Sequence, residues 1–308
     1  MPWIVAGAFL VEGAIGWPRR LSHPVVWVGG LIAMLERRWN RQARLEPARR
    51  RLGVVTVLIL VFLAGGAGWG VERLAAAAAL WPGVLLVVVC GATGLAARSL
   101  FDHVRAIARP LTAGDLPQAR HAVSMIVGRD VDAMDEGDVA RAALESLAES
   151  FCDGVVAPVF WFVIGGLPGL FVYKAVNTAD SMIGHMEPRW RAFGWAAARA
   201  DDLMNWIPAR IAGALIALGG GQGWRVMWRD ARKHASPNAG WPEAAMAGAL
   251  RVRLGGPVRY DGVPTQRPDF GEWAPPRAHD LHRGLRVYGV ACALLMLLLI
   301  AGGFAWPF

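Results

Sequence analysis

The side chains most able to do chemistry lie between residues 141 and 210, at both ends of an uncharged run of membrane-spanning length. Ionisable groups at a membrane boundary are costly to desolvate, so a cluster of them usually has a function. Here the cluster mixes carboxylates with a lysine, amides, a histidine and an arginine. That mixture favours a charged substrate held together with a metal ion over simple anchoring in the membrane.

Before the uncharged run, four charged residues repeat every four positions: Arg141, Glu145, Glu149 and Asp153. On a helix this spacing places them along one stripe. Carboxylates at the membrane end of such a stripe are suitable ligands for Mg²⁺, which binds carboxylate oxygens and substrate phosphates. On spacing alone, a solvated stripe of ion pairs explains the pattern better.

After the run, polar residues recur at the i, i+3, i+4 and i+7 positions of a helix: Lys174, Asn177, Thr178 and Ser181. Asp180 and His185 belong to the same segment. One interpretation is an interfacial helix whose lysine extends toward the headgroups. The density of hydrogen-bonding groups favours a binding site.

A further cluster follows, with the adjacent acids Asp201 and Asp202 and then Asn205, Pro208 and Arg210. Neighbouring acids beside an apolar segment are unfavourable unless they are paired or bound to metal. Arg210 either neutralises them or binds a phosphate through its two-pronged guanidinium group. The sequence alone leaves both roles open.

The last cluster lies in HASPNAGWPEAAMAGAL and contains His234, Ser236 and Asn238. Pro242 and Glu243 mark an ordinary helix start. A helix N-terminus beside serine and asparagine is also a ready anion site. The chain contains no G-x-x-x-x-G-K-[ST] loop, so any nucleotide binds without the usual phosphate loop.

The elements that position these residues are membrane helices. The chain has 308 residues, of which 55% are hydrophobic and 18% charged, against about 25% charged in soluble proteins. Uncharged runs cover residues 53–71, 74–97, 154–173 and 287–308, and about 20 apolar residues cross a bilayer. We therefore expect an all-α, polytopic integral membrane protein with about four spanning helices, the first of them a marginal span over residues 2–18.

Charge sets the expected topology. Nine arginines in residues 18–52 place that loop in the cytoplasm. The run 154–173 is broken at Gly165–Gly169, which favours a re-entrant hairpin with both flanks cytoplasmic; a conventional crossing is the alternative. The expected segments are 1–97 (three membrane helices and the basic loop), 98–153 (cytoplasmic helices), 154–220 (short membrane segments with the main motifs), 221–283 (cytoplasmic) and 284–308 (the last membrane helix).

Several long motifs occur in order along nearly the whole chain, among them HPVVWVGGLIAMLE, VGRD, ARAALESLAESFCDGVVAPVFW, GLPGLFVYKAVNTADSMIGH and FGWAAARADDLMNWIPARI. Together they resemble the CobD/CbiB family of cobalamin biosynthesis, the adenosylcobinamide-phosphate synthases. Two positions depart from the family pattern. Ser150 replaces an asparagine, and Trp17 stands where an acid is expected.

The resemblance implies an ATP-dependent ligase that joins adenosylcobyric acid to (R)-1-amino-2-propanol O-phosphate through an amide bond, giving adenosylcobinamide phosphate. It implies Mg²⁺ with ATP as co-substrate, and as partners the corrinoid, aminopropanol phosphate and the lipid bilayer, with no nucleic acid. Other membrane enzymes of the corrinoid pathway are further candidate partners. The expected location is the inner (cytoplasmic) membrane, with several passes and an active site facing the cytoplasm.

With that reaction, each residue receives an expected role. The Mg²⁺ ligands are Asp180, Asp201 and Asp202, with Glu149 and Asp153 as further candidates. The catalytic candidates are Lys174, which also binds phosphate, and the bases His185 or Glu145. Substrate or phosphate binding falls to Asn177, Ser181, Arg210, His234, Ser236 and Asn238.

Two other classes compete with the ligase. A Mg²⁺-dependent membrane transferase acting on a lipid pyrophosphate or phospho-alcohol also uses paired acids beside apolar helices. Such enzymes usually carry two carboxylate motifs on repeated units, and no internal repeat is visible here. A non-enzymatic scaffold or transporter is the third class, and it would place charges inside the central spans.

Overall fold

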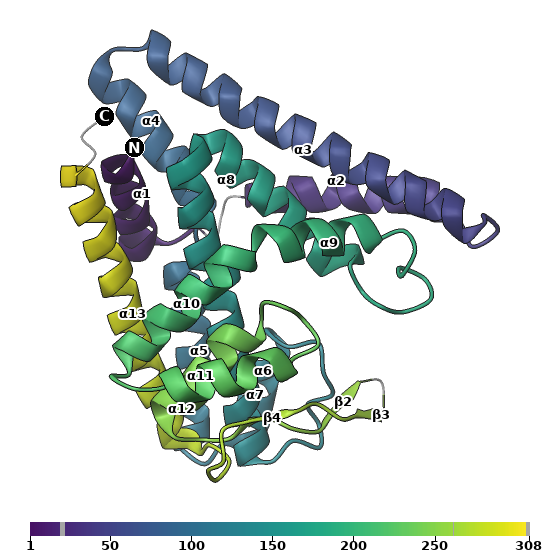
Figure 1. The fold of residues 1–308 in the computed structure, drawn as a ribbon, viewed down its shortest axis with the longest axis vertical. Coiled ribbons are helices and arrows are strands. Elements are labelled where there is room, and N and C mark those ends of the chain that lie inside the picture. The colour runs from purple at the N-terminus through teal and green to yellow at the C-terminus, as the bar shows by residue number, and fades with distance from the viewer. Residues whose placement is uncertain (19–21, 261, 306–308) are drawn as a thin grey trace. The chain divides into compact units, whose positions relative to one another are not determined.

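A computed structural model describes residues 1–18, 22–260 and 262–305 (Figure 1). Arg19 and Arg20 of the predicted basic loop, and the last three residues of the predicted C-terminal span, lie outside the described residues. The fold is helical, as expected, and it divides into two compact units. The first unit contains residues 1–96, 157–205 and 299–308, and the second contains residues 97–156 and 206–298.

The first unit is built from six helices and the end of a seventh. They are α1 (Pro2–Ile15), α2 (Pro24–Trp39), α3 (Glu46–Ala77), α4 (Leu80–Ala92), α8 (Ala157–Ile183) and α9 (Trp195–Met204), with the last residues of α13 (Ala278–Ala305). In the described part of the chain, four helical segments are long and apolar enough to cross a membrane: Glu46–Ala77, Leu80–Thr112, Glu136–Ile183 and Ala278–Ala305. The protein is therefore a multi-pass membrane protein.

The turn between α3 and α4 differs from the sequence expectation. The uncharged runs 53–71 and 74–97 are separated by Glu72 and Arg73 alone, and this spacing predicts the connection at those two residues. The structure continues α3 to Ala77 and turns at Ala78. The alanine-rich segment favours helix, and the Glu72 carboxylate has a partner elsewhere in the unit.

The Glu72 carboxylate binds the backbone at a break within α8. Gly166 has φ +60° and ψ −154°, so two helices meet there instead of one continuous helix. Leu167 N–H, at the start of the second helix, donates to Glu72 Oε1 at 2.8 Å. A Cβ added to Gly169 would lie only 2.5 Å from the carbonyl oxygen of Trp161. Eight residues of straight helix would separate these positions by about 12 Å, so the chain folds back as a hairpin.

The hairpin confirms the expected break at Gly165–Gly169. Its tip rests closely on α3, where a Cβ at Gly68 would lie 2.5 Å from Pro168 N. A glycine is required at Gly166 because its backbone is in the left-handed region, which other residues rarely adopt. That both flanks of the hairpin lie on one side of the bilayer stays a prediction.

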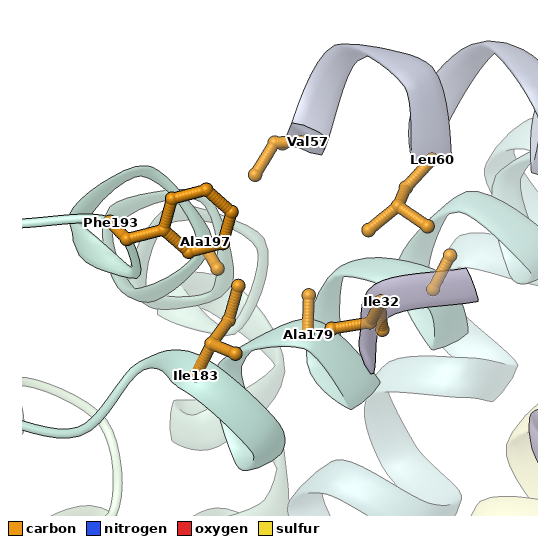
Figure 2. Packing of buried hydrophobic residues seen from close by; sticks show 8 residues of the cluster. Ile32, Val57, Leu60, Ala179, Ile183, Phe193 and Ala197 are labelled. Carbon is orange, nitrogen blue, oxygen red and sulfur yellow. The ribbon is translucent and has the colours of Figure 1, made fainter. Parts of the chain in front are cut away.

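Figure 2 shows the core of the first unit, where α2, α3, α8 and α9 contribute one buried apolar cluster. Its members are Ile32, Val57, Leu60, Ala175, Ala179, Ile183, Phe193 and Ala197. Phe193 is fully buried. Burying such a side chain contributes about 1.5–3 kcal/mol. This packing fixes the second half of α8 against α9. These two helices carry the polar residues Asn177 and Asp201.

The second unit surrounds a helix of small residues. It contains α5 (Ala97–Thr112), α6 (Leu116–Ser124), α7 (Glu136–Phe151), the π-helix η1 (Cys152–Val156), α10 (Trp206–Gly219), α11 (Trp224–Asp230), the 3₁₀ turn η2 (Ala231–Lys233), α12 (Gly240–Leu250) and most of α13. Every residue of α12 is buried. Small residues let α10 and α12 approach each other closely. A Cβ on Gly213 of α10 would lie 3.0 Å from the carbonyl oxygen of Trp241 in α12.

Four short strands complete this unit. β1 (Leu254–Gly255) pairs antiparallel with β4 (Asp269–Phe270), and β2 (Val258–Tyr260) pairs antiparallel with β3 (Val263–Thr265). Residues 254–270 thereby form two small ribbons in a segment expected to be cytoplasmic. The ribbons bring arginines from this distant segment against α7.

Candidate functional site

The first candidate site surrounds Asp201 in the first unit. Asp201 is 8% exposed. Its Oδ1 accepts from Asn177 Nδ2 at 3.2 Å, and its Oδ2 accepts from Asn205 Nδ2 at 3.0 Å. Tyr173 Oη donates to Asn205 Oδ1 at 3.0 Å. Tyr173 and Asn177 lie one helical turn apart on α8, and Asp201 and Asn205 lie one turn apart at the end of α9. This spacing aligns the four polar groups, and the Asp201 carboxylate is the final acceptor of the network.

The carboxylate of Asp201 is held by neutral amides, so its charge is not cancelled by its direct partners. Burial raises the pKa of Asp201, and the neighbouring Asp202 raises it further, whereas the two amide hydrogen bonds and the Lys174 charge lower it. Lys174 is thus a cationic influence on this group. Burial is costly for a charged carboxylate, and a cation bound nearby would reduce that cost.

His23 caps the start of α2, and the charge of Lys174 also acts on its side chain. Burial, and then the charge of Lys174, lower the pKa of His23. Its Nδ1 accepts from Val25 N–H at 3.2 Å, so the neutral ring carries its proton on Nε2. His23 is thus a neutral hydrogen-bond donor in this unit.

Lys174 also lines an apolar cavity of about 440 Å³ formed by α2, α3, α4 and α8. It is the one lining residue with a charged side chain; Thr93 adds a hydroxyl, and nearly all the others are apolar. The lysine therefore borders both an apolar volume and the Asp201 cluster. An amphipathic substrate with an anionic end matches that combination.

The other predicted residues of this segment are placed differently. Asp202 is half-buried and pairs with Arg199 at 3.1 Å; burial raises its pKa, and the Arg199 charge opposes this. The Thr178 and Ser181 hydroxyls donate to the carbonyl oxygens of Lys174 and Asn177, one turn earlier on their own helix. These two hydroxyls satisfy the helix backbone.

Asp180 and His185 lie at the end of α8 and in the loop after it. Asp180 is half-buried, and a Cβ on Gly184 would lie 1.9 Å from its Oδ1. His185 is exposed, and its ring centroid is 5.5 Å from that of Trp190. The structure therefore packs Asp180 closely against the backbone of the turn and leaves His185 on the surface.

A partly buried network of hydrogen bonds and one ion pair fixes the loop that carries His185. Arg189 donates to both oxygens of Glu36 at 3.1 and 3.2 Å. Asn40 Nδ2 donates to Glu36 Oε1 at 3.0 Å and to the Arg189 carbonyl oxygen at 3.0 Å. Arg49, which is 4% exposed, donates to Asn40 Oδ1 at 2.7 Å and to the Arg189 carbonyl. These contacts anchor the loop to the ends of α2 and α3.

The residues of this unit fit the expected Mg²⁺ only in part. Among the described residues, no group of three or more His, Cys, Asp or Glu side chains forms a complete metal site. Mg²⁺ usually binds through one or two carboxylates and completes its shell with water and substrate phosphates. Asp201 and Asp202 provide such a pair.

The second candidate site is an ion network around Glu145 in the second unit. Glu145 Oε2 accepts from Arg129 Nη2 at 2.8 Å and from Arg267 Nη1 at 3.1 Å, and Oε1 accepts from Gly255 N–H at 2.7 Å. Arg267 also donates to Glu243 Oε2 at 3.2 Å. Burial raises the pKa of Glu243 well above its ordinary value, with the charges of Glu145 and Glu149 adding to the effect.

His234 borders this network. Its Nδ1 accepts from Ser236 N–H at 2.9 Å, and its Nε2 lies 3.0 Å from Arg267 Nη2 and 3.7 Å from Glu243 Oε1. Burial, followed by the Arg267 charge, lowers the pKa of His234. A neutral His234 beside a guanidinium helps to fill the interior without adding another cation.

The remaining predicted binding residues organise the start of α12. Ser236 Oγ accepts from the N–H groups of Asn238 and Ala239 at 3.2 and 3.3 Å. The helix begins at Gly240, close to the expected start at Pro242. Arg210 Nη1 donates to Asn238 Oδ1 at 3.3 Å, and its guanidinium lies over the rings of Trp206 and Trp241 at 4.4 and 4.7 Å.

The stripe predicted from residues 141–153 is distributed among different environments. Arg141 pairs with Asp138, Glu145 is in the buried network, and Glu149 is exposed. Asp153 lies in η1, where π-helical hydrogen bonding shifts the side chains out of α-helical register. The four residues therefore do not act as one continuous row.

Sequence reasoning missed Arg129, Arg267 and Tyr173 as members of these clusters. Arg129 lies in VGRD, a motif that carried the family resemblance but received no role. Arg267 is 122 residues from Glu145, so no local spacing could reveal the pair. Tyr173 lies one helical turn before Asn177, and that spacing was the available signal.

The chain is similar to known proteins along almost its whole length. A model of the family described as CobD/Cbib protein matches residues 5–288. The chain belongs to this family. A cobalamin biosynthesis protein CobD from Rhodobacter capsulatus is 51% identical over 94% of this chain and 93% of its own length.

More distant members of the CobD/Cbib family cover the chain equally well. Proteins of the same name are 45% identical in Geobacter metallireducens (96% of this chain, 94% of theirs) and 41% identical in Klebsiella pneumoniae (97% and 96%). No solved structure matches the chain. The expected family and its place in cobalamin biosynthesis are thus confirmed, and neither the lipid transferase nor the scaffold or transporter is supported.

Proposed function

We propose that this chain is the adenosylcobinamide-phosphate synthase of its organism, an acid–amine ligase of cobalamin biosynthesis. It forms the amide between adenosylcobyric acid and (R)-1-amino-2-propanol O-phosphate with cleavage of ATP. The observation that carries the proposal is the CobD/Cbib family match over residues 5–288. Within the structure, the Asp201 cluster and Lys174 are the groups best suited to the phosphate chemistry.

The reaction needs activation because a carboxylate and an amine do not condense unaided in water. A propionate oxygen attacks the γ-phosphorus of ATP, and the bond to ADP breaks, which leaves an acyl phosphate. The amine nitrogen then attacks the acyl carbon, phosphate leaves, and the nitrogen loses its proton to a base. Charge neutralisation at the transferred phosphoryl group is the main demand on the protein.

Lys174 and His23 meet that demand in the first unit. The Lys174 ammonium binds phosphate oxygens, and its position beside the apolar cavity leaves room for the apolar part of a substrate. The Nε2–H of His23 provides a neutral donor to the same charge. Asn177 and Asn205 keep the Asp201 oxygens in one orientation.

Asp201 and Asp202 would hold Mg²⁺, which would neutralise the phosphates of ATP when bound. Asp180, in the same unit, is a secondary candidate for this role. The amide hydrogen bonds to Asp201 use one lone pair on each oxygen and leave the carboxylate able to accept further bonds. Such support by surrounding donors orients a ligand and tunes its affinity.

For the proton transfer we favour His185 over Glu145. Glu145 already accepts from two guanidinium groups and one backbone N–H, so both of its oxygens are engaged within the fold. Its role is to position Arg129 and Arg267. His185 is exposed on an anchored loop, and its imidazole is a side chain able to accept the proton.

The setting follows from the same reaction. The substrates are the corrinoid, the phosphorylated amine and ATP, and the bilayer surrounds the spanning helices. We place the protein in the inner membrane with its active site toward the cytoplasm, where ATP is found, and other membrane enzymes of the corrinoid pathway are candidate partners. Ser181, Arg210, His234, Ser236 and Asn238 remain candidates for substrate contacts.

The test is a reconstituted reaction. Purified protein is incubated with adenosylcobyric acid, the phosphorylated amine and ATP-Mg²⁺, and the amide product is detected by mass. We expect stoichiometric ADP and product, with a loss of at least about 100-fold for the nearly isosteric Asp201→Asn. No product from well-folded wild-type protein would overturn the function, and wild-type turnover in both Asp201→Asn and Asp202→Asn would remove the metal assignment.

A further inference from the structure

The second unit contains a small cavity whose walls carry charges of both signs. Its volume is about 250 Å³, and it is formed by the loop before α7, the start of α7 and the β2–β3 ribbon. Half of its lining residues are charged: Arg129, Asp130, Asp138, Arg141 and Arg259. Three guanidinium groups and two carboxylates therefore line one small volume.

The lining is held by contacts that keep these charges in place. Asp130 Oδ2 accepts from Gly262 N–H at 2.7 Å, and Asp130 N–H donates to the Arg259 carbonyl at 3.0 Å, so the ribbon is tied to the loop. Arg129, 9% exposed, is fixed by Glu145. Arg141 Nη2 donates to Asp138 Oδ1 at 2.6 Å and to the Pro257 carbonyl at 3.4 Å.

One donor in this wall lacks an acceptor. Among the described residues, Arg141 Nε is a buried side-chain nitrogen with no hydrogen-bond partner. An unsatisfied buried donor is costly, and more so on a charged group. An oxyanion in the cavity would relieve this cost, because a guanidinium group that turns toward a phosphate donates through two nitrogens in parallel.

The size and the charge pattern restrict the ligand. Pockets for drug-sized molecules occupy about 300–1,000 Å³, so this one suits a smaller molecule than a nucleotide or a corrinoid. A simple anion would explain the arginines but not Asp130 and Asp138. A small zwitterion with a phosphate at one end and an ammonium at the other satisfies both sets.

We propose that this cavity is the binding site for the phosphorylated amino-alcohol substrate. Its phosphate lies against Arg141, Arg129 and Arg259, and its ammonium group lies toward Asp130 and Asp138. The proposal rests on the proposed function, since that reaction supplies the zwitterion. It assigns the ribbon and the VGRD loop to recognition of the amine substrate.

The direct test is binding without turnover. Purified wild-type protein in nanodiscs is titrated calorimetrically with (R)-1-amino-2-propanol O-phosphate, with 1-amino-2-propanol and with inorganic phosphate. We expect the zwitterion to bind most tightly, and Arg141→Met and Arg259→Met each to weaken it about 10- to 100-fold. Arg141→Lys recovers part of the loss, and the exposed Arg105→Met serves as the matched control.

The kinetic test separates this site from the chemistry. In Arg259→Met, which changes an exposed side chain of the ribbon, the KM for the phosphorylated amine should rise about tenfold while the KM for ATP is unchanged. Unchanged zwitterion affinity in both Arg141→Met and Arg259→Met would overturn the site. If wild-type protein made no amide product, the proposed function would fail, yet zwitterion binding and its loss in these variants would still decide the site.

Discussion

Two buried carboxylates, Asp201 in the first unit and Glu145 in the second, are satisfied in opposite ways. Asp201 accepts from two neutral amides, so neither of these partners cancels the charge of the carboxylate. Glu145 accepts from two guanidinium groups and a backbone N–H, so its charge is compensated within the fold. The comparison separates a carboxylate held by neutral donors, which we propose binds an external cation, from one that is compensated by cations of the protein itself.

The largest effect is expected from a variant that breaks the ion network around Glu145. Arg267→Met leaves Glu145 with one cation and removes the guanidinium that bonds Glu243. Removing one partner of a buried ion pair costs about 3–5 kcal/mol. We expect a large fall in the unfolding midpoint in detergent, followed by circular dichroism, whereas Asp201→Asn should leave that midpoint nearly unchanged. Equal destabilisation by both variants would contradict the distinction.

Removal of the cation beside Asp201 should affect catalysis more than stability. Lys174→Met keeps the aliphatic stem against the apolar cavity but removes the charge. We expect a drop of about 100-fold in kcat/KM, because hydrogen bonds from a charged group to a phosphate contribute about 1.5–3 kcal/mol. The exposed Arg191→Met is the control and should retain full activity. A fall in thermal stability that accounts for the lost activity would assign Lys174 a structural role.

The hairpin that carries Lys174 can be strained without substituting any polar residue. Gly166→Ala places a Cβ in a left-handed backbone and 2.2 Å from Glu72 Oε1. We expect a loss of about 1–3 kcal/mol in stability. Gly165→Ala is the matched control, because a Cβ there meets nothing within 4 Å. Thermal unfolding of both variants measures the difference, and an equal response would refute the break at Gly166.

The smallest effect concerns pH. Burial raises the pKa of Glu243, so the folded state holds its proton more tightly than the unfolded state. The stabilising effect is complete below the ordinary value of 4.5 and declines as pH rises through the window up to the raised pKa. Glu243→Gln should flatten this decline in denaturant unfolding measured from pH 5 to 8. An unchanged slope would show that Glu243 is ionised in the folded protein.

Local patterns revealed much of the first unit. The uncharged runs predicted the membrane helices, the glycines and proline at 165–169 predicted the hairpin, and the spacing of Asn177 placed it on the polar face. The turn after α3 was misplaced because Glu72 bonds Leu167 N–H, a contact 95 residues away. Charge alone marked Glu72 as a loop residue.

The second unit was less predictable for the same physical reason. Arg129, Arg267 and Glu145 meet because two small ribbons fold over α7, and no periodicity encodes that contact. The stripe from Arg141 to Asp153 has ideal helical spacing, but the partners of Glu145 lie on other elements and Asp153 lies in a π-helix. Spacing predicts which residues share a face and not what covers that face.

Positional isotope exchange tests the central claim most directly. ATP carrying oxygen-18 in the β,γ-bridge is incubated with wild-type protein, Mg²⁺ and adenosylcobyric acid, without the amine. If the Asp201 cluster supports phosphoryl transfer to the propionate, the label scrambles into the non-bridging β-positions in wild type and Arg259→Met, and not in Asp201→Asn. Scrambling at the wild-type rate in Asp201→Asn, or none in a wild-type protein that still forms the amide, would contradict the account.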